Sequence, residues 1–114
     1  MKDEKEGLEV LSSGSKQSAV LARFDLLSPA GLKRLATVRG LGAIKYPVDN
    51  WKGIPVESHL NHALNHIYLF LDGDTEEDHL GHAFCRLMFA VDLNEKERTE
   101  NKCPTEVQAQ PELS

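Results

Sequence analysis

The 114-residue sequence has few cysteines and no long apolar segment. Its two cysteines, Cys85 and Cys103, give no disulfide framework, so both are expected to be free thiols in a reducing cytoplasm. No apolar run approaches the length of a membrane span, and the first residues, MKDEKEG, contain no signal-peptide core. A formal net charge of −5 argues against a general nucleic-acid or membrane-surface binder. We therefore expect no membrane partner and no direct nucleic-acid binding.

Several common catalytic motifs are also missing. The sequence contains no GxxxxGK[ST] phosphate-binding loop, no GxSxG nucleophile elbow and no CxxC pair. Cys85 lies within a predicted helix, where a core position is favoured over a nucleophile. The residues that remain for chemistry are histidines and carboxylates, and they are concentrated in one segment.

That segment, residues 58–92, contains all five histidines and an internal repeat with an offset of 20. Five residues recur: His59, Leu60, His62, Ala63 and Asp72 reappear as His79, Leu80, His82, Ala83 and Asp92. The repeat predicts two helices of one kind joined by a short acidic loop. A tight loop makes them an antiparallel pair.

The spacing of apolar residues supports both helices. Positions i, i+4, i+7 and i+11 form one apolar face on each: Leu60, Leu64, Ile67 and Leu71, then Leu80, Phe84, Leu87 and Val91. A second stripe beside each face holds His59, His62 and His66, then His79, His82 and Arg86. Antiparallel packing is expected to bring His66 towards His79 and His82.

The loop between the two helices suggests where each ends. Gly73 suits a helix C-terminus, and Thr75 suits the N-cap of the next helix. Glu76, Glu77 and Asp78 then fall in a first turn, where the helix dipole favours negative charge. We expect helices near 56–72 and 76–93.

A further helix is predicted at 29–43, because Ser28-Pro29 is a typical helix start. Its expected buried face is Leu32, Leu35, Ala36 and Ala43. Residues 1–18 are expected to be a mobile polar segment, 19–93 a helical domain, and 94–114 a polar tail, disordered beyond one further helical turn. This domain is small for a single hydrophobic core, so we expect a homo-oligomer, a dimer or higher.

Residues 45–55 form a predicted loop rich in proline and polar residues. The loop carries Lys45, Tyr46, Asn50 and the only tryptophan, Trp51. Two roles remain open for its aromatic residues: recognition of a ligand, or covering one end of the core.

The acidic loop and the histidines allow a metal site. Magnesium and manganese ions prefer carboxylate oxygens, and histidine pairs at i, i+3 can chelate a metal, transfer protons or bind phosphate. The competing interpretation is structural: acids that cap a helix and histidines that satisfy local hydrogen bonds. Capping is favoured for Glu76, whereas both roles remain open for Asp78.

Several motifs together resemble the dATP/dGTP diphosphohydrolase N-terminal domain family, many of whose members are phage proteins. The matching segments are RFDLL at 23–27, GAIKY at 42–46, NWKG at 50–53, His66, and GDTEEDHLGHA at 73–83. This family is similar to the MazG-like all-α nucleoside triphosphate pyrophosphohydrolases. The resemblance implies an all-α fold, a small helical bundle built on an antiparallel helix pair. It also implies a phage-encoded protein in the host cytoplasm.

The resemblance implies cleavage of purine deoxynucleoside triphosphates to monophosphate and pyrophosphate, with Mg²⁺ or Mn²⁺. The implied catalytic residues are Glu77, Asp78 and His79. The implied metal ligands are Asp74, Glu77, Asp78, His66 and His82. The implied substrate-binding residues are Lys45, Tyr46, Asn50, Trp51 and Arg86. No role follows for Arg23 or Asp25.

The sequence departs from the family pattern at two positions, where Asn65 replaces an arginine and Arg86 replaces an asparagine. His59 and His62 lie outside the pattern. An alternative is therefore a non-catalytic phage factor that binds a nucleotide or a host protein. A His-Asp phosphohydrolase ranks last, because the order is reversed in Asp78-His79.

Overall fold

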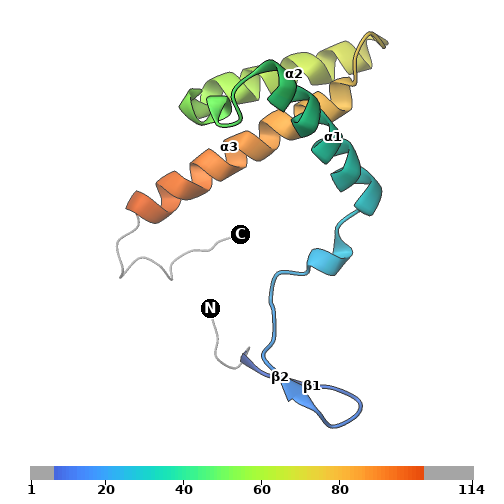
Figure 1. Cartoon of the computed structure of the whole chain (residues 1–114), viewed down its shortest axis with the longest axis vertical. Coiled ribbons are helices and arrows are strands. Elements are labelled where there is room, and N and C mark those ends of the chain that lie inside the picture. The colour runs from blue at the N-terminus through green and yellow to red at the C-terminus, as the bar shows by residue number, and fades with distance from the viewer. Residues whose placement is uncertain (1–6, 102–114) are drawn as a thin grey trace. The chain divides into compact units, whose positions relative to one another are not determined.

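The computed structural model describes residues 7–101, which belong to two compact units (Figure 1). Residues 7–28 belong to the first unit and residues 29–101 to the second. Residues 1–6 of the expected mobile segment, the expected thiol Cys103 and the rest of the tail beyond residue 101 lie outside the described residues. Cys85 is a free thiol, as expected, and is buried.

The first unit contains a small hairpin. Strands β1 (Glu9–Val10) and β2 (Lys16–Gln17) pair antiparallel, and Gly14 turns the chain between them with a φ of +95°. A single 3-10 turn, η2 (Phe24–Leu26), follows. Strands of two residues carry no periodic signal, so the sequence pattern does not predict them.

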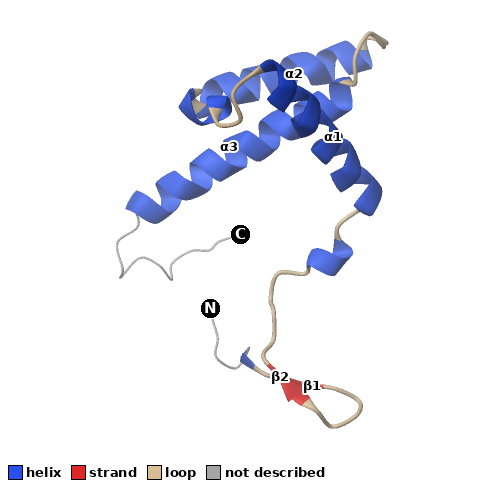
Figure 2. Ribbon diagram, viewed as in Figure 1, coloured by secondary structure: helices blue, strands red, loops and turns tan. Residues whose placement is uncertain are grey.

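The second unit is all-α, which confirms the expected fold class (Figure 2). It contains helices α1 (Pro29–Lys45), α2 (Val56–Leu71) and α3 (His79–Asn101), with a 3-10 turn η3 (Asn50–Gly53) between α1 and α2. The first two helices are confirmed to within two residues at each end. The third begins three residues later than predicted and continues to residue 101. None of the helices within residues 7–101 combines the length and hydrophobicity of a membrane span.

The predicted start of α3 is wrong. Asp78, rather than Thr75, caps the helix: its Oδ1 accepts a hydrogen bond from the Gly81 amide at 3.0 Å, and its carbonyl accepts one from the His82 amide. Upstream, the Asp74 carboxylate accepts a hydrogen bond from the Glu76 amide at 2.8 Å. That local bond stabilises a turn in place of a helical turn, so the three acidic residues precede the helix.

The end of α2 follows from one glycine. Gly73 has a φ of +89°, and its amide donates to the carbonyl of Phe70. The Asp74 amide donates to the carbonyl of Leu69. These two bonds form a Schellman motif, which satisfies the last carbonyls of the helix and reverses the chain. The expected helix end at Gly73 is thereby confirmed.

The apolar core joins α1 to α3. Leu35 and Val38 of α1 are buried with Cys85 and Phe89 of α3, and Trp51 and Met88 pack against this cluster. The predicted buried face of α1 is right for Leu35 and wrong for Leu32, Ala36 and Ala43, which are exposed. The many small residues of α1 give a weak apolar periodicity, so its orientation was poorly specified by sequence.

A polar seam joins α2 to α3, which lie side by side and run in opposite directions (Figure 1). Four histidines of the two stripes line this seam: His59 and His79 are buried with Ala63, Ala83 and Ala90, and His66 and His82 are half-buried. His62 is exposed. The apolar stripes face outward instead. Their exposed members are Leu60, Leu64, Leu71, Leu80, Phe84, Leu87 and Val91, with exposed fractions between 40% and 70%. Small alanines let the two backbones approach, and imidazoles in the seam find hydrogen-bond partners across it.

Candidate functional site

Three side chains converge where α2, the acidic loop and α3 meet. His66, Glu77 and His82 offer ligand atoms that all lie within 4.8 Å of one another. The rings of His66 and His82 stack with centroids 5.0 Å apart, and Nε2 of His82 lies 3.6 Å from the Glu77 carboxylate. Two imidazoles and a carboxylate are a donor set that can bind a divalent cation.

A chain of hydrogen bonds stands behind His66. Nδ1 of His66 lies 2.9 Å from Nδ1 of His79, and Nε2 of His79 lies 3.0 Å from the Asp74 carboxylate. His79 is only 3% exposed, so its ring orientation is fixed by these contacts. Bonds from the Glu76 amide and from His79 lower the pKa of Asp74, so this carboxylate is ionised and accepts.

These hydrogen bonds indicate which ring nitrogens of His66 and His79 carry protons. Asp74 accepts from Nε2–H of His79, and in the tautomer of His79 with its single proton on Nε2, Nδ1 has a lone pair that accepts from Nδ1–H of His66. Nε2 of His66 is then left with a lone pair. Burial, followed by the charge of His82, lowers the pKa of His66 and favours this neutral form. Asp74 and His79 therefore orient the ring of His66, although neither residue belongs to the cluster of His66, Glu77 and His82.

Asp78 lies next to the cluster but is engaged elsewhere. Its carboxylate accepts hydrogen bonds from Arg34 of α1, with Nε at 2.9 Å from Oδ2, while it also caps α3. Arg34, as the main cause, lowers the pKa of Asp78 to about 2. The structure thus gives Asp78 a structural role that joins α1 to α3. Arg34 was missed from the sequence, because nothing in its pattern points to a residue 44 positions away.

Gly81 permits this arrangement. A Cβ at this position would lie 2.2 Å from Asp78 Oδ2 and 3.0 Å from Val38 Cγ2. Glycine in a helix interior normally reduces stability by about 1 kcal/mol relative to alanine. Its presence here lets the capping carboxylate and α1 approach the first turn of α3.

A second buried imidazole lies further along the same seam. His59 is 0% exposed; its Nδ1 lies 2.9 Å from Nη1 of Arg86, and its Nε2 lies 3.0 Å from the Trp51 carbonyl. Trp51 stacks on Phe89 with ring centroids 4.4 Å apart. The ring of Trp51 therefore covers the core, and its carbonyl fixes His59. The sequence pattern left His59 without a role, and it does not contain the contacts to Arg86 and Trp51 that accompany its burial.

The other expected substrate residues lie in the connection after α1. Lys45 ends α1, with its Nζ 5.5 Å from the ring centroid of Tyr46, and Asn50 opens η3. All three are exposed. Within residues 7–101, no hydrogen bond or ion pair links these side chains to the cluster of His66, Glu77 and His82.

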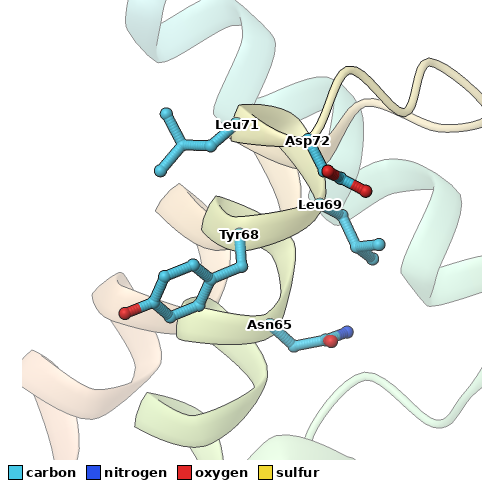
Figure 3. Close-up of a pocket in the computed structure, with 5 residues that line it drawn as sticks. All are labelled: Asn65, Tyr68, Leu69, Leu71 and Asp72. Carbon is cyan, nitrogen blue, oxygen red and sulfur yellow. The ribbon is translucent and has the colours of Figure 1, made fainter.

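A surface hollow lies elsewhere in the described region. It has a volume of about 400 Å³ and is lined by Asn65, Tyr68, Leu69, Leu71 and Asp72 (Figure 3). All five residues belong to the end of α2 or its cap, so a single helix provides its lining. The donor chemistry of the three converging side chains makes that cluster, rather than the hollow, the candidate site.

Comparison with known families identifies one relationship that covers most of the chain. The model of a family described as dATP/dGTP diphosphohydrolase, N-terminal, matches residues 12–103. No curated protein and no solved structure matches the chain. The matched region includes the whole cluster, the Asp74–His79 chain and the His59–Arg86 pair.

Proposed function

The chain belongs to the dATP/dGTP diphosphohydrolase N-terminal family, and from that premise we propose that it hydrolyses purine deoxynucleoside triphosphates to monophosphate and pyrophosphate. The family's name points to a hydrolase of acid anhydrides. The observation that carries the proposal is the convergence of His66, Glu77 and His82, supported by the hydrogen bonds that orient His66. A triphosphate is strongly anionic, so an acidic loop binds it through a cation.

His66, Glu77 and His82 would hold that cation. The donor chemistry fits Mn²⁺ better than Mg²⁺, because imidazole nitrogens suit the transition metals whereas magnesium prefers oxygen. When bound, the cation would neutralise phosphate charge and lower the pKa of a coordinated water. This site differs from the larger ligand set expected from sequence, since Asp74 orients His79 and Asp78 pairs with Arg34.

Glu77 would also act as the proton acceptor in the reaction. Glu77 is exposed, and a carboxylate oxygen not used as a ligand accepts the proton of the attacking water. A bond forms between water oxygen and the α-phosphorus, and the bond from that phosphorus to the bridging oxygen breaks. Pyrophosphate leaves with the electron pair. His79 is not the base, because both of its ring nitrogens are already engaged.

The proposal includes a homo-oligomer, in which a second copy of the chain covers the exposed apolar stripes. Cys85 and Phe89 face α1, whereas Phe84, Leu87 and Val91 lie on the other side of α3, next to the exposed apolar stripe of α2. Together the two stripes form an exposed apolar surface that a second copy could bury, and a standard interface buries ~800 Å² on each partner. Leu64→Glu should shift the assembly towards monomer in light scattering. An unchanged mass would place the interface elsewhere.

The catalytic proposal is tested by pyrophosphate release from the four deoxynucleoside triphosphates with Mn²⁺. The full-length protein should prefer dATP and dGTP. Glu77→Gln should reduce the rate on the order of 100-fold, because it removes a ligand charge and the proton acceptor. Glu76→Gln is the matched control, since Glu76 is adjacent, exposed and outside the converging set. Nucleotide binding without pyrophosphate release would favour the non-catalytic alternative.

A further inference from the structure

Arg86 is a half-buried cation in the seam between α2 and α3. Its one hydrogen bond to a side chain in the described region runs from Nη1 to Nδ1 of His59, a neutral ring. No carboxylate among residues 7–101 forms an ion pair with it. Burial, as the main cause, lowers the pKa of Arg86. A guanidinium removed from water in this way is stabilised when an anion completes its hydrogen bonds.

His59 fixes the direction of this guanidinium. Arginine can only donate, so Nδ1 of His59 must accept, and Nε2–H of His59 donates to the Trp51 carbonyl. The ring is fully buried and lies against Phe89, with centroids 5.3 Å apart. Because both ring nitrogens are used, rotation of His59 would break two bonds. Nη1 of Arg86 is therefore anchored, whereas no residue among 7–101 accepts a hydrogen bond from its Nε or Nη2.

The guanidinium of Arg86 lies close to the candidate cation site. Arg86 follows His82 by four residues, which places it one helical turn along the same stripe, about 6 Å further along the axis. Its charge also acts on the ring of His66. A cation at His66, Glu77 and His82 and the guanidinium of Arg86 would thus form two positive positions in a row on one side of the helix pair.

We propose that Arg86 is a polyphosphate subsite, which binds the terminal phosphates of a nucleoside triphosphate while the cation binds the rest of the chain, and that His59 is its positioning residue. The inference rests on the proposed function and deepens it by assigning a second contact to the triphosphate. A chain of linked phosphates spans both positions, whereas a single inorganic phosphate reaches only one. The planar fork of arginine matches two oxygens of one phosphate.

The test compares two ligands on the full-length protein by calorimetry: Mn²⁺ alone, and inorganic tripolyphosphate with saturating Mn²⁺. The variants are Arg86→Gln, Arg86→Lys, His59→Phe and the Arg86→Gln/His59→Phe double variant. Arg39→Gln is the matched control, because Arg39 is also half-buried but packs over Phe89 and donates to the Val48 carbonyl. Affinity for Mn²⁺ alone reports whether the seam has kept its structure.

Arg86→Gln should leave Mn²⁺ affinity within about twofold and weaken tripolyphosphate binding about tenfold, the effect of losing one charge-assisted contact. Arg86→Lys should fall between this variant and the parent, since it keeps the charge and loses the fork. His59→Phe should weaken tripolyphosphate binding about threefold to fivefold. The double variant should bind no more weakly than Arg86→Gln, because His59 acts only through Arg86. Inorganic phosphate should show little dependence on Arg86.

Four results would overturn the inference. Unchanged tripolyphosphate binding in Arg86→Gln would remove the subsite, and parallel loss of Mn²⁺ and tripolyphosphate affinity would make Arg86 structural. A monomeric Arg86→Gln with normal tripolyphosphate binding would assign Arg86 to a carboxylate of a second copy. Additive losses in the double variant would reject His59 as a positioning residue. A failure of the proposed function can be distinguished from these results. If tripolyphosphate binding needs Arg86 but no Mn²⁺, the cation site is wrong and the Arg86 subsite remains.

Discussion

His59 and His79 occupy equivalent positions of the internal repeat, and both are buried. They nevertheless form hydrogen bonds with side chains of opposite charge. His79 lies at the loop end of the seam and donates to the Asp74 carboxylate, so its environment is electronegative. His59 accepts from Arg86, so its environment is electropositive. The two ends of the seam therefore differ in electrostatic character, with a carboxylate beside His79 and a guanidinium beside His59.

The next pair of repeat equivalents shows the same divergence. His82 lies beside Glu77 and His66, whereas His62 is exposed on α2. The acidic loop explains the difference, because only the second helix begins directly after it. A histidine stripe therefore specifies a function only together with the charges that adjoin it.

The largest effect should be the difference in Mn²⁺ affinity between His82→Ala and His62→Ala. His82→Ala removes one of the three proposed ligands and should lower Mn²⁺ affinity on the order of 100-fold or more. His62→Ala, at the equivalent position, should change it less than about twofold, since His62 is not in the converging set. Calorimetry or electron paramagnetic resonance of the two variants measures this contrast. Equal losses would show that the two helices share the metal site.

A smaller effect should appear in stability at the loop end. Gly81→Ala places a methyl group against Asp78 and Val38, so the capping bond or the α1 contact must shift. We expect the free energy of unfolding to fall by about 1–2 kcal/mol. Gly40→Ala in α1, with nothing within 4 Å of the added carbon, should be neutral or stabilising by up to about 1 kcal/mol. Urea denaturation measures both, and the opposite order would contradict the close approach of α1 to α3.

An effect of similar size should come from Asp74, the carboxylate that orients His79. Asp74→Asn keeps the size of the side chain but removes the charge that fixes the tautomer of His79. Mn²⁺ affinity should fall about tenfold, as for other residues that orient metal ligands. Asp72→Asn, in the same loop, is the control because Asp72 makes no side-chain bond to the histidines among the described residues. If both substitutions had the same effect, net loop charge rather than orientation would be responsible.

The helices were predictable from sequence because apolar spacing, Ser28-Pro29 and Gly73 are local signals. The choice of buried face was not, since the histidine and leucine stripes lie next to each other on each helix and either can face a partner. Hydrophobicity alone favours burying Leu64 and Phe84. The structure buries His59 and His79 because each finds hydrogen bonds across the seam, which depend on residues distant in sequence.

The structure brings together three residues that the sequence suggested as ligands, and their binding of a metal stays a prediction. His66, Glu77 and His82 were all expected as ligands, and the acidic loop was expected beside them. Asp74 and Asp78 could not be separated from Glu77 by residue type. Their roles depend on Arg34 in α1 and on the rotation of His79, neither of which has a pattern in the sequence.

The proposed function requires one cation held by His66, Glu77 and His82. A crystal structure of the full-length protein grown with Mn²⁺, with anomalous scattering recorded at the manganese edge, tests it most directly. We predict a single strong peak bonded to Nε2 of His66, a nitrogen of His82 and the Glu77 carboxylate, with the Asp74–His79 chain intact behind it. A peak bonded to Asp74 and Asp78, with Arg34 displaced, would contradict the assignment.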